Sequence, residues 1–165
     1  MAATNGTQAP VLTLMVGGPG SGKSTVVRRL YADATVVDMD AIKATHPEYD
    51  PKSPGAVHAW SQQVAIRQAF RLISEAQSFV FDSTGTNVER LMTFIAAAHA
   101  TGMKVEAVLV TCSIQTALRR NALRARTVPD ELVIEKHAMV SAAWASVHAL
   151  ADRALVVENE DAPAA

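Results

Sequence analysis

The chain is poor in cysteine and aromatic residues, and it has no excess of charge of either sign. One of its 165 residues is cysteine, Cys112, which excludes an intrachain disulfide and fits a reducing compartment. The formal net charge of −1 gives no global electrostatic reason to expect nucleic acid or an anionic membrane as a partner. No apolar run reaches membrane-spanning length, and residues 1–9 lack the pattern of a signal peptide. We therefore expect a cytoplasmic protein without a membrane partner.

Apolar residues make up 49% of the chain and charged residues 19%, so the sequence belongs to a folded protein rather than a disordered one. Its length suits one domain with a sizeable core. We expect that domain over residues 10–158, with flexible tails at 1–9 and 159–165.

Strand and helix signals alternate along the chain, which predicts an α/β fold with a largely parallel sheet. The expected strands are 11–16, 35–38, 78–82, 105–111 and 154–157. The expected helices are 24–31, 41–45, 56–77, 88–100, 114–126 and 129–150.

A glycine-rich segment follows the first strand and fits the pattern G-x-x-x-x-G-K-[ST] between Gly17 and Ser24. Its glycines let the backbone fold around a polyphosphate, and its N–H groups form an anion-binding nest at a helix N-terminus. Lys23 supplies charge to the β- and γ-phosphates, and the Ser24 hydroxyl is placed to bind Mg²⁺. The residues expected to bind the nucleotide are Gly18, Pro19, Gly20, Ser21, Gly22, Lys23, Ser24 and Thr25. A glycine-rich turn that binds nothing is the disfavoured alternative.

Motors, GTPases and small kinases share this loop, so other polar residues must decide the reaction. Asp38 and Asp40 follow the second strand, at the sheet edge where ligands of open α/β folds bind. Asp40 is a candidate to orient an acceptor hydroxyl and take its proton, with Lys43 one helical turn later to hold an anionic acceptor. The alternative is that Asp38 or Asp40 only caps the short helix.

Asp82 ends the third strand, which is the usual setting for a carboxylate that holds Mg²⁺ directly or through water. The alternative is a structural turn. Thr84 lies in the following loop, which is rich in hydroxyl and amide groups and suits either an acceptor site or an ordinary turn.

Four arginines, Arg119, Arg120, Arg124 and Arg126, follow the fourth strand without an acid among them. On the expected helix, Arg120 and Arg124 lie one above the other. Guanidinium groups suit phosphate, so these two are candidates to reach a transferring phosphoryl group from a lid. A solvated basic helix face or a small nucleic-acid patch is the alternative.

Together these residues resemble the P-loop kinase group that contains polynucleotide 5′-kinases, the zeta toxins and chloramphenicol phosphotransferase. The resemblance covers roughly residues 11–143. In the polynucleotide kinases an aspartate after the second strand is the general base, with a basic residue, commonly arginine, three positions on; the matching positions are Asp40 and Lys43. The lid arginines of these kinases match Arg120 and Arg124. Residues 40–49 look closer to the zeta toxins, which use the same aspartate to phosphorylate a UDP-linked amino sugar.

The resemblance implies a single-domain P-loop kinase fold, with a five-stranded parallel sheet of order 2-3-1-4-5 and an arginine-bearing lid helix. It implies transfer of the γ-phosphoryl group of ATP, or of GTP, to an acceptor hydroxyl in the presence of Mg²⁺, with nucleic acid among the possible acceptors. The implied roles are catalysis by Asp40, Lys23, Arg120 and Arg124, acceptor binding by Lys43, Asp38 and Thr84, and metal binding by Ser24 and Asp82. A slow regulatory NTPase and an antibiotic phosphotransferase stay open, and the sequence specifies neither the acceptor nor the oligomeric state.

Overall fold

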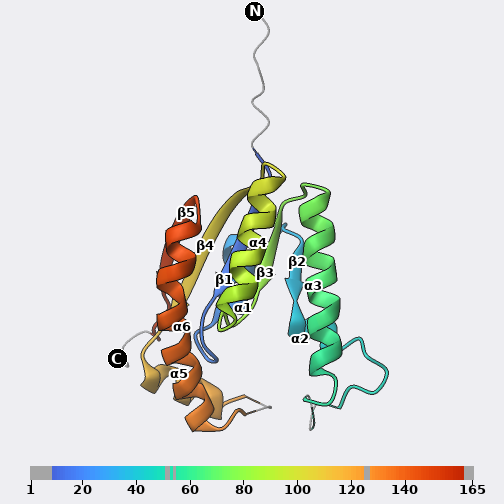
Figure 1. The fold of residues 1–165 in the computed structure, drawn as a ribbon. Coiled ribbons are helices and arrows are strands. Elements are labelled where there is room, and N and C mark those ends of the chain that lie inside the picture. The colour runs from blue at the N-terminus through green and yellow to red at the C-terminus, as the bar shows by residue number, and fades with distance from the viewer. Residues whose placement is uncertain (1–8, 51–52, 54, 125–126, 162–165) are drawn as a thin grey trace, which may run out of the picture.

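A computed structural model describes residues 9–50, 53, 55–124 and 127–161. These residues form one sheet of five parallel strands in the order β2-β3-β1-β4-β5 (Figure 1). The strands are β1 (Val11–Val16), β2 (Val36–Asp38), β3 (Phe79–Asp82), β4 (Lys104–Thr111) and β5 (Arg153–Glu158). The fold class and strand order implied by the resemblance are therefore confirmed.

Helices lie on both faces of the sheet. They are α1 (Lys23–Leu30), α2 (Met39–Lys43), α3 (His58–Ser74), α4 (Val88–Ala100), α5 (Ile114–Ala122) and α6 (Asp130–Leu150). In Figure 1, α3, α4 and α6 lie in front of the sheet and α1 lies behind it. None of the helices within the described ranges combines the length and the apolar character needed to cross a bilayer.

The central strands are buried on both faces, as an all-parallel sheet requires. Leu12 and Leu14 of β1 pack with α3, α4 and α6, where Phe94 is fully buried. Met15, also in β1, packs on the opposite face with Val26 of α1. Because both faces are covered, polar groups gather at the strand ends instead, and the carboxyl ends of the strands share one edge.

Several helix ends follow from side-chain caps. The Oδ1 atom of Asn87 accepts from the main-chain N–H of Arg90 at 2.9 Å, which starts α4 where the sequence predicts it. Ser113 caps α5 in the same way through the N–H of Thr116. These caps fix where α4 and α5 begin, next to the functional edge of the sheet.

Two predicted helices are shorter than expected. The helix expected over 56–77 is α3, which covers His58–Ser74. The sequence predicts a helix over 114–126, but α5 ends at Ala122 with Leu123 as its C-cap. Arg124 follows in a bend and does not stack over Arg120 on a helix; residues 125 and 126 lie outside the described residues. The helix ends here because the side chain of buried Asn121 bonds the main chain of Val128. Its Oδ1 accepts from the Val128 N–H at 3.0 Å and its Nδ2 donates to the Val128 carbonyl oxygen at 2.6 Å. The expected tail segments 1–8 and 162–165 also lie outside the described residues.

Candidate active site

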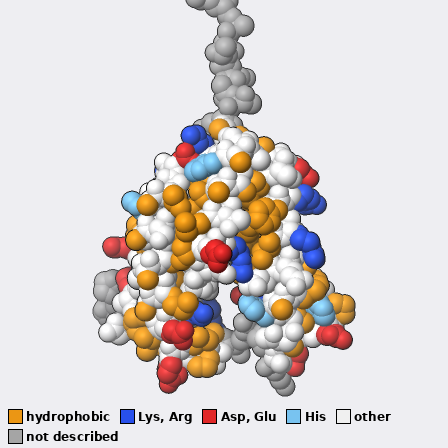
Figure 2. Space-filling model, viewed as in Figure 1, with side chains coloured by type: hydrophobic (Ala, Val, Ile, Leu, Met, Phe, Trp, Pro, Cys, Tyr) orange, Lys and Arg blue, Asp and Glu red, His pale blue; other side chains and the backbone are white. Residues whose placement is uncertain are grey.

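A cleft of about 770 Å³ opens at the carboxyl ends of the strands. Its walls come from the loop after β1, from α2, from the β3–α4 loop, from Arg124 and residues 127–129, and from the N-terminal turns of α3, α4 and α6. Figure 2 shows the hollow at the lower edge of the molecule, between two lobes that correspond to α5 and α6 on one side and α2 and α3 on the other. This is the edge at which open α/β sheets bind ligands.

The loop between β1 and α1 is shaped as a cradle of main-chain donors. Gly20 and Gly22 have positive φ angles of 79° and 87°, which L side chains rarely adopt. Within the described part of the chain, the N–H groups of Gly20, Gly22, Lys23 and Ser24 donate to no protein acceptor. Unpaired donors at the start of a helix suit the oxygens of a polyphosphate, so the loop fits the nucleotide that the sequence implies.

Lys23 lies at the base of this cradle. Its Nζ donates to the carbonyl oxygen of Gly17 at 2.7 Å. Burial lowers the pKa of Lys23, while the nearby carboxylates of Asp82 and Asp40 act in the opposite direction. A partly desolvated ammonium is a stronger electrostatic partner for a phosphate than a solvated one, because less water screens it.

Of the eight residues predicted to bind the nucleotide, five line the cleft, namely Pro19, Gly20, Gly22, Lys23 and Ser24. Gly18 instead packs against the ring of His137, and Thr25 accepts a hydrogen bond from Arg28. Ser21 is fully buried, and its Oγ has no hydrogen-bond partner in the described structure.

Asp38 and Asp40 both line the cleft, and they differ in what they do locally. Asp38 caps α2, with its Oδ1 accepting from the N–H of Asp40 at 2.8 Å. The helix-cap alternative therefore holds for Asp38. The side chain of Asp40 is 69% exposed and forms an ion pair at 2.9 Å with buried Lys43. The cap leaves Asp40 at the surface of the cleft that the phosphate loop also lines.

Asp82 and Ser24 face the cleft together and supply a carboxylate and a hydroxyl oxygen. Burial raises the pKa of Asp82 to about 6, and Lys23 opposes this rise. Among the described residues no cluster of three metal-ligating side chains occurs. A pair of hard oxygen donors fits Mg²⁺, which usually takes one or two protein ligands and completes its shell with phosphate and water.

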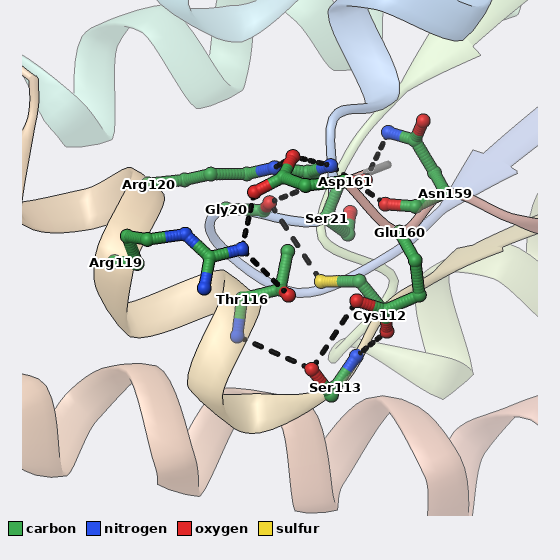
Figure 3. A network of polar contacts seen from close by, with 10 residues as sticks. All are labelled: Gly20, Ser21, Cys112, Ser113, Thr116, Arg119, Arg120, Asn159, Glu160 and Asp161. Atoms are coloured by element: carbon green, nitrogen blue, oxygen red, sulfur yellow. Dashed lines mark hydrogen bonds and ion pairs between the residues drawn. The ribbon is translucent and has the colours of Figure 1, made fainter. Parts of the chain in front are cut away.

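Arg120 contacts the phosphate loop from outside the cleft. Its guanidinium donates to the carbonyl oxygens of Gly20 at 3.1 Å and Asn159 at 2.8 Å, and it pairs with Asp161 at 2.7 Å. Arg119 also pairs with Asp161, and Figure 3 shows the two arginines converging on this carboxylate. Arg120 is thus bound to the rear of the loop, and it does not line the cleft.

The segment after β5 takes part in the same network, although the sequence places it in a flexible tail. The side-chain amide of Asn159 donates to the carbonyl oxygen of Ser21 at 2.8 Å, and Glu160 accepts from the main chain and hydroxyl of Ser113 (Figure 3). These contacts tie the end of β5 to the loop that would hold the phosphates. No motif in the sequence signals them, because they depend on β5 ending beside the loop.

Arg124 lines the cleft, and its charge is close enough to lower the pKa of Lys23 further. The Asn121–Val128 hydrogen bonds hold the ends of the segment that carries it. The two arginines predicted to bind phosphate therefore occupy different positions. Arg124 lines the cleft, whereas Arg120 hydrogen-bonds the phosphate loop.

The sequence does not single out three other polar groups of the cleft: His58 and Gln62 on α3, and Lys136 on α6. The only available signal was the four-residue spacing of His58 and Gln62, which places them on one helix face. Thr84 lines the cleft as expected, and its hydroxyl contacts that of Thr86 at 3.2 Å.

Comparison with protein families finds one model, AAA_33, described as an AAA domain, that matches residues 12–152. No protein among the curated sequences compared matches the chain.

Solved structures share the fold at low sequence identity. The PezAT toxin–antitoxin system of Streptococcus pneumoniae has a TM-score of 0.72 and 14% identity over 94% of this chain and 72% of that one. The complex of AvrRxo1-ORF1 with AvrRxo1-ORF2 has a TM-score of 0.68 and 20% identity over 85% of this chain, which spans half of the other. Shikimate kinase from Bacteroides thetaiotaomicron has a TM-score of 0.58 and 11% identity over 93% and 89%.

Proposed function

The chain belongs to the AAA_33 family of AAA domains, and on that premise we propose that it is an ATP-dependent kinase acting on an alcohol. The acceptor hydroxyl belongs to a polynucleotide or to a nucleotide sugar, the two classes to which the sequence resemblance points. One observation carries the proposal: Lys23 of the phosphate loop and Asp40 of α2 line the same cleft.

Each part of the cleft has a step in this reaction. The main-chain donors of the loop bind the β- and γ-phosphates, and Lys23 turns its ammonium toward them. Asp40 accepts the proton of the acceptor hydroxyl while that oxygen forms a bond to the γ-phosphorus and the bond to the β–γ bridging oxygen breaks. Arg124 offsets the negative charge on the moving phosphoryl group. The products are ADP and a phosphate monoester.

Ser24 and Asp82 would hold Mg²⁺, which supplies charge neutralisation at the β- and γ-phosphate oxygens. Arg120 acts indirectly, because its hydrogen bonds to Gly20 and Asn159 stabilise the conformation of the phosphate loop. Its proposed contribution is positioning, whereas the sequence alone suggested direct contact with the phosphoryl group.

The fate of the γ-phosphate tests the proposal. The protein is incubated with γ-labelled ATP, Mg²⁺ and one of three acceptors: a 5′-hydroxyl oligonucleotide, a UDP-amino sugar or chloramphenicol. We expect label on one of the first two. Label on chloramphenicol would point to an antibiotic phosphotransferase, and release only as inorganic phosphate would point to a regulatory NTPase.

Nucleotide binding is tested separately. We expect Lys23→Ala to weaken ATP binding in calorimetry, because it removes the charge at the base of the cradle. Unchanged ATP affinity would contradict the assignment of the phosphate loop.

A further inference from the structure

Part of the cleft wall is formed by α3, α4 and α6. His58 and Gln62 reach it from the first half of α3, Arg90 from the first turn of α4, and Lys136 from α6. These side chains come from segments far apart in the sequence. Only the fold brings them to the cleft that Asp40, the carboxylate proposed to activate the acceptor, also lines.

Positive charge predominates in this region. The guanidinium of Arg90 contacts the side-chain amide of Gln62 at 3.0 and 3.2 Å, with the amide oxygen turned toward it. Across the described ranges, neither Arg90 nor Lys136 has a carboxylate at ion-pair distance. The third cation, Lys43, already pairs with Asp40.

The pKa of His58 reflects the charges near it. Burial lowers its pKa, and Lys43, Arg90 and Lys136 lower it further, with only Asp40 acting in the opposite direction. Three cations and one carboxylate therefore lie near enough to His58 to act on its charge, and all of them except Lys136 come from α2 and α4. Converging like charges inside a cleft repel one another unless an anion is bound between them.

We propose that Arg90 and Lys136, with Gln62 and His58, form a subsite for a phosphate group of the acceptor, so that the substrate is a phosphate-bearing alcohol. This rests on the proposed kinase function and specifies its substrate class. Arg90 presents a planar pair of donors that matches two phosphate oxygens, and Lys136 adds a point charge. A polynucleotide and a nucleotide sugar both carry such a phosphate.

Binding of matched probe pairs tests the subsite without turnover. Calorimetry is carried out on the full chain with Mg²⁺ and a non-hydrolysable ATP analogue. One pair is thymidine 3′-monophosphate and thymidine; the other is UDP-N-acetylglucosamine and N-acetylglucosamine. The pair that shows the larger gain from its phosphate identifies the source of the phosphate group.

Arg90→Gln removes the charge and keeps an amide beside Gln62. We expect it to weaken binding of the phosphate-bearing probe by about 10- to 100-fold, as for the loss of one charge-assisted hydrogen bond, and to leave its neutral counterpart unchanged. Arg90→Lys should restore part of the affinity. The matched control Arg67→Gln removes an exposed arginine of α3 that does not line the cleft and should change neither.

An NMR titration of His58 gives an independent readout, because a bound phosphate should raise the pKa of this imidazole and the neutral probe should not. The subsite is refuted if wild-type protein binds neither phosphate-bearing probe more tightly than its neutral partner, or if Arg90→Gln weakens both members of a pair equally. Failure of the kinase proposal looks different: the phosphate-bearing probe still binds through Arg90, yet the γ-phosphate reaches no alcohol.

Discussion

The carboxylate of Asp40 lies 2.9 Å from the ammonium of Lys43, one turn further along α2. Asp38 caps this helix, so a single short element presents both charges to the cleft. Lys43 is buried whereas the Asp40 side chain is 69% exposed, so a buried ammonium anchors a carboxylate at the surface. The proposed acceptor hydroxyl would reach this carboxylate from the cleft that Asp40 lines.

Asp40→Asn should separate proton transfer from nucleotide binding. We expect kcat to fall by about 10²- to 10⁴-fold, the usual contribution of a positioned acid–base group, with ATP affinity unchanged. Steady-state kinetics and calorimetry measure the two effects. Asp33→Asn, at an exposed position outside this cleft, is the matched control and should leave both values unchanged. Normal turnover by Asp40→Asn would show that another group activates the acceptor.

Arg124→Ala should reduce turnover more than binding. Arg124 lines the cleft, and its proposed partner is the phosphoryl group in transit. We expect kcat to fall by about 10²-fold, as when one preorganised donor to a transition state is removed, with an unchanged melting temperature. A weaker ATP affinity at unchanged kcat would instead place Arg124 on the ground-state nucleotide.

Arg120→Ala should show the opposite pattern. Because its guanidinium bonds the carbonyl oxygens of Gly20 and Asn159, its loss loosens the phosphate loop. We expect weaker ATP binding and about 1–3 kcal/mol lower stability, with a smaller change in kcat at saturating ATP. Calorimetry, thermal melting and saturation kinetics measure the three quantities. A large loss in kcat with unchanged stability would support the direct phosphate contact suggested by the sequence.

The strands and the phosphate loop were predictable because their signals are local. The apolar run 11–16, the glycine spacing after it and the helix start at residue 88 each depend on a few residues, and the structure places them as expected. The strand order came from family resemblance, since alternation of elements does not specify which strands are neighbours.

Contacts between distant segments were not predictable. Asn121 ends α5 early by bonding Val128, and Asp161 meets Arg120 only because β5 ends beside the phosphate loop. The Arg90–Gln62 contact likewise joins α4 to α3. Such pairs depend on tertiary packing, and residue type and spacing carry no information about it.

The pKa of Asp82 should give the protein a measurable pH dependence. Burial raises this pKa to about 6 from the ordinary value of 3.8. Between these values the folded protein keeps a proton that the unfolded chain has released, so the free energy of unfolding falls as pH rises. The shift lowers the free energy of unfolding by about 3 kcal/mol between pH 3.5 and pH 7.

Asp82→Asn should remove this part of the pH dependence. Urea unfolding in EDTA at several pH values measures it as the difference between wild type and variant, which cancels the other titrating groups. We expect the variant to gain stability relative to wild type as pH rises from about 4 to about 6, and the difference to level off above that range. Parallel curves over this range would show that Asp82 has an ordinary pKa, and Asp33→Asn is the exposed control.

Gly18 and His137 should behave as a coupled pair. The ring of His137 donates to the carbonyl oxygen of Pro19 at 2.9 Å, and a Cβ at Gly18 would overlap that ring. We expect Gly18→Ala to push the ring away, break this hydrogen bond and weaken ATP binding. His137→Ala alone loses the bond but makes room, so the double variant should bind ATP better than the two single effects predict when added. The coupling should be about 1–2 kcal/mol in a double-mutant cycle, measured by calorimetry.

Gly55→Ala, where a Cβ meets open space, is the control glycine. Additive effects would mean that His137 does not set the position of the phosphate loop.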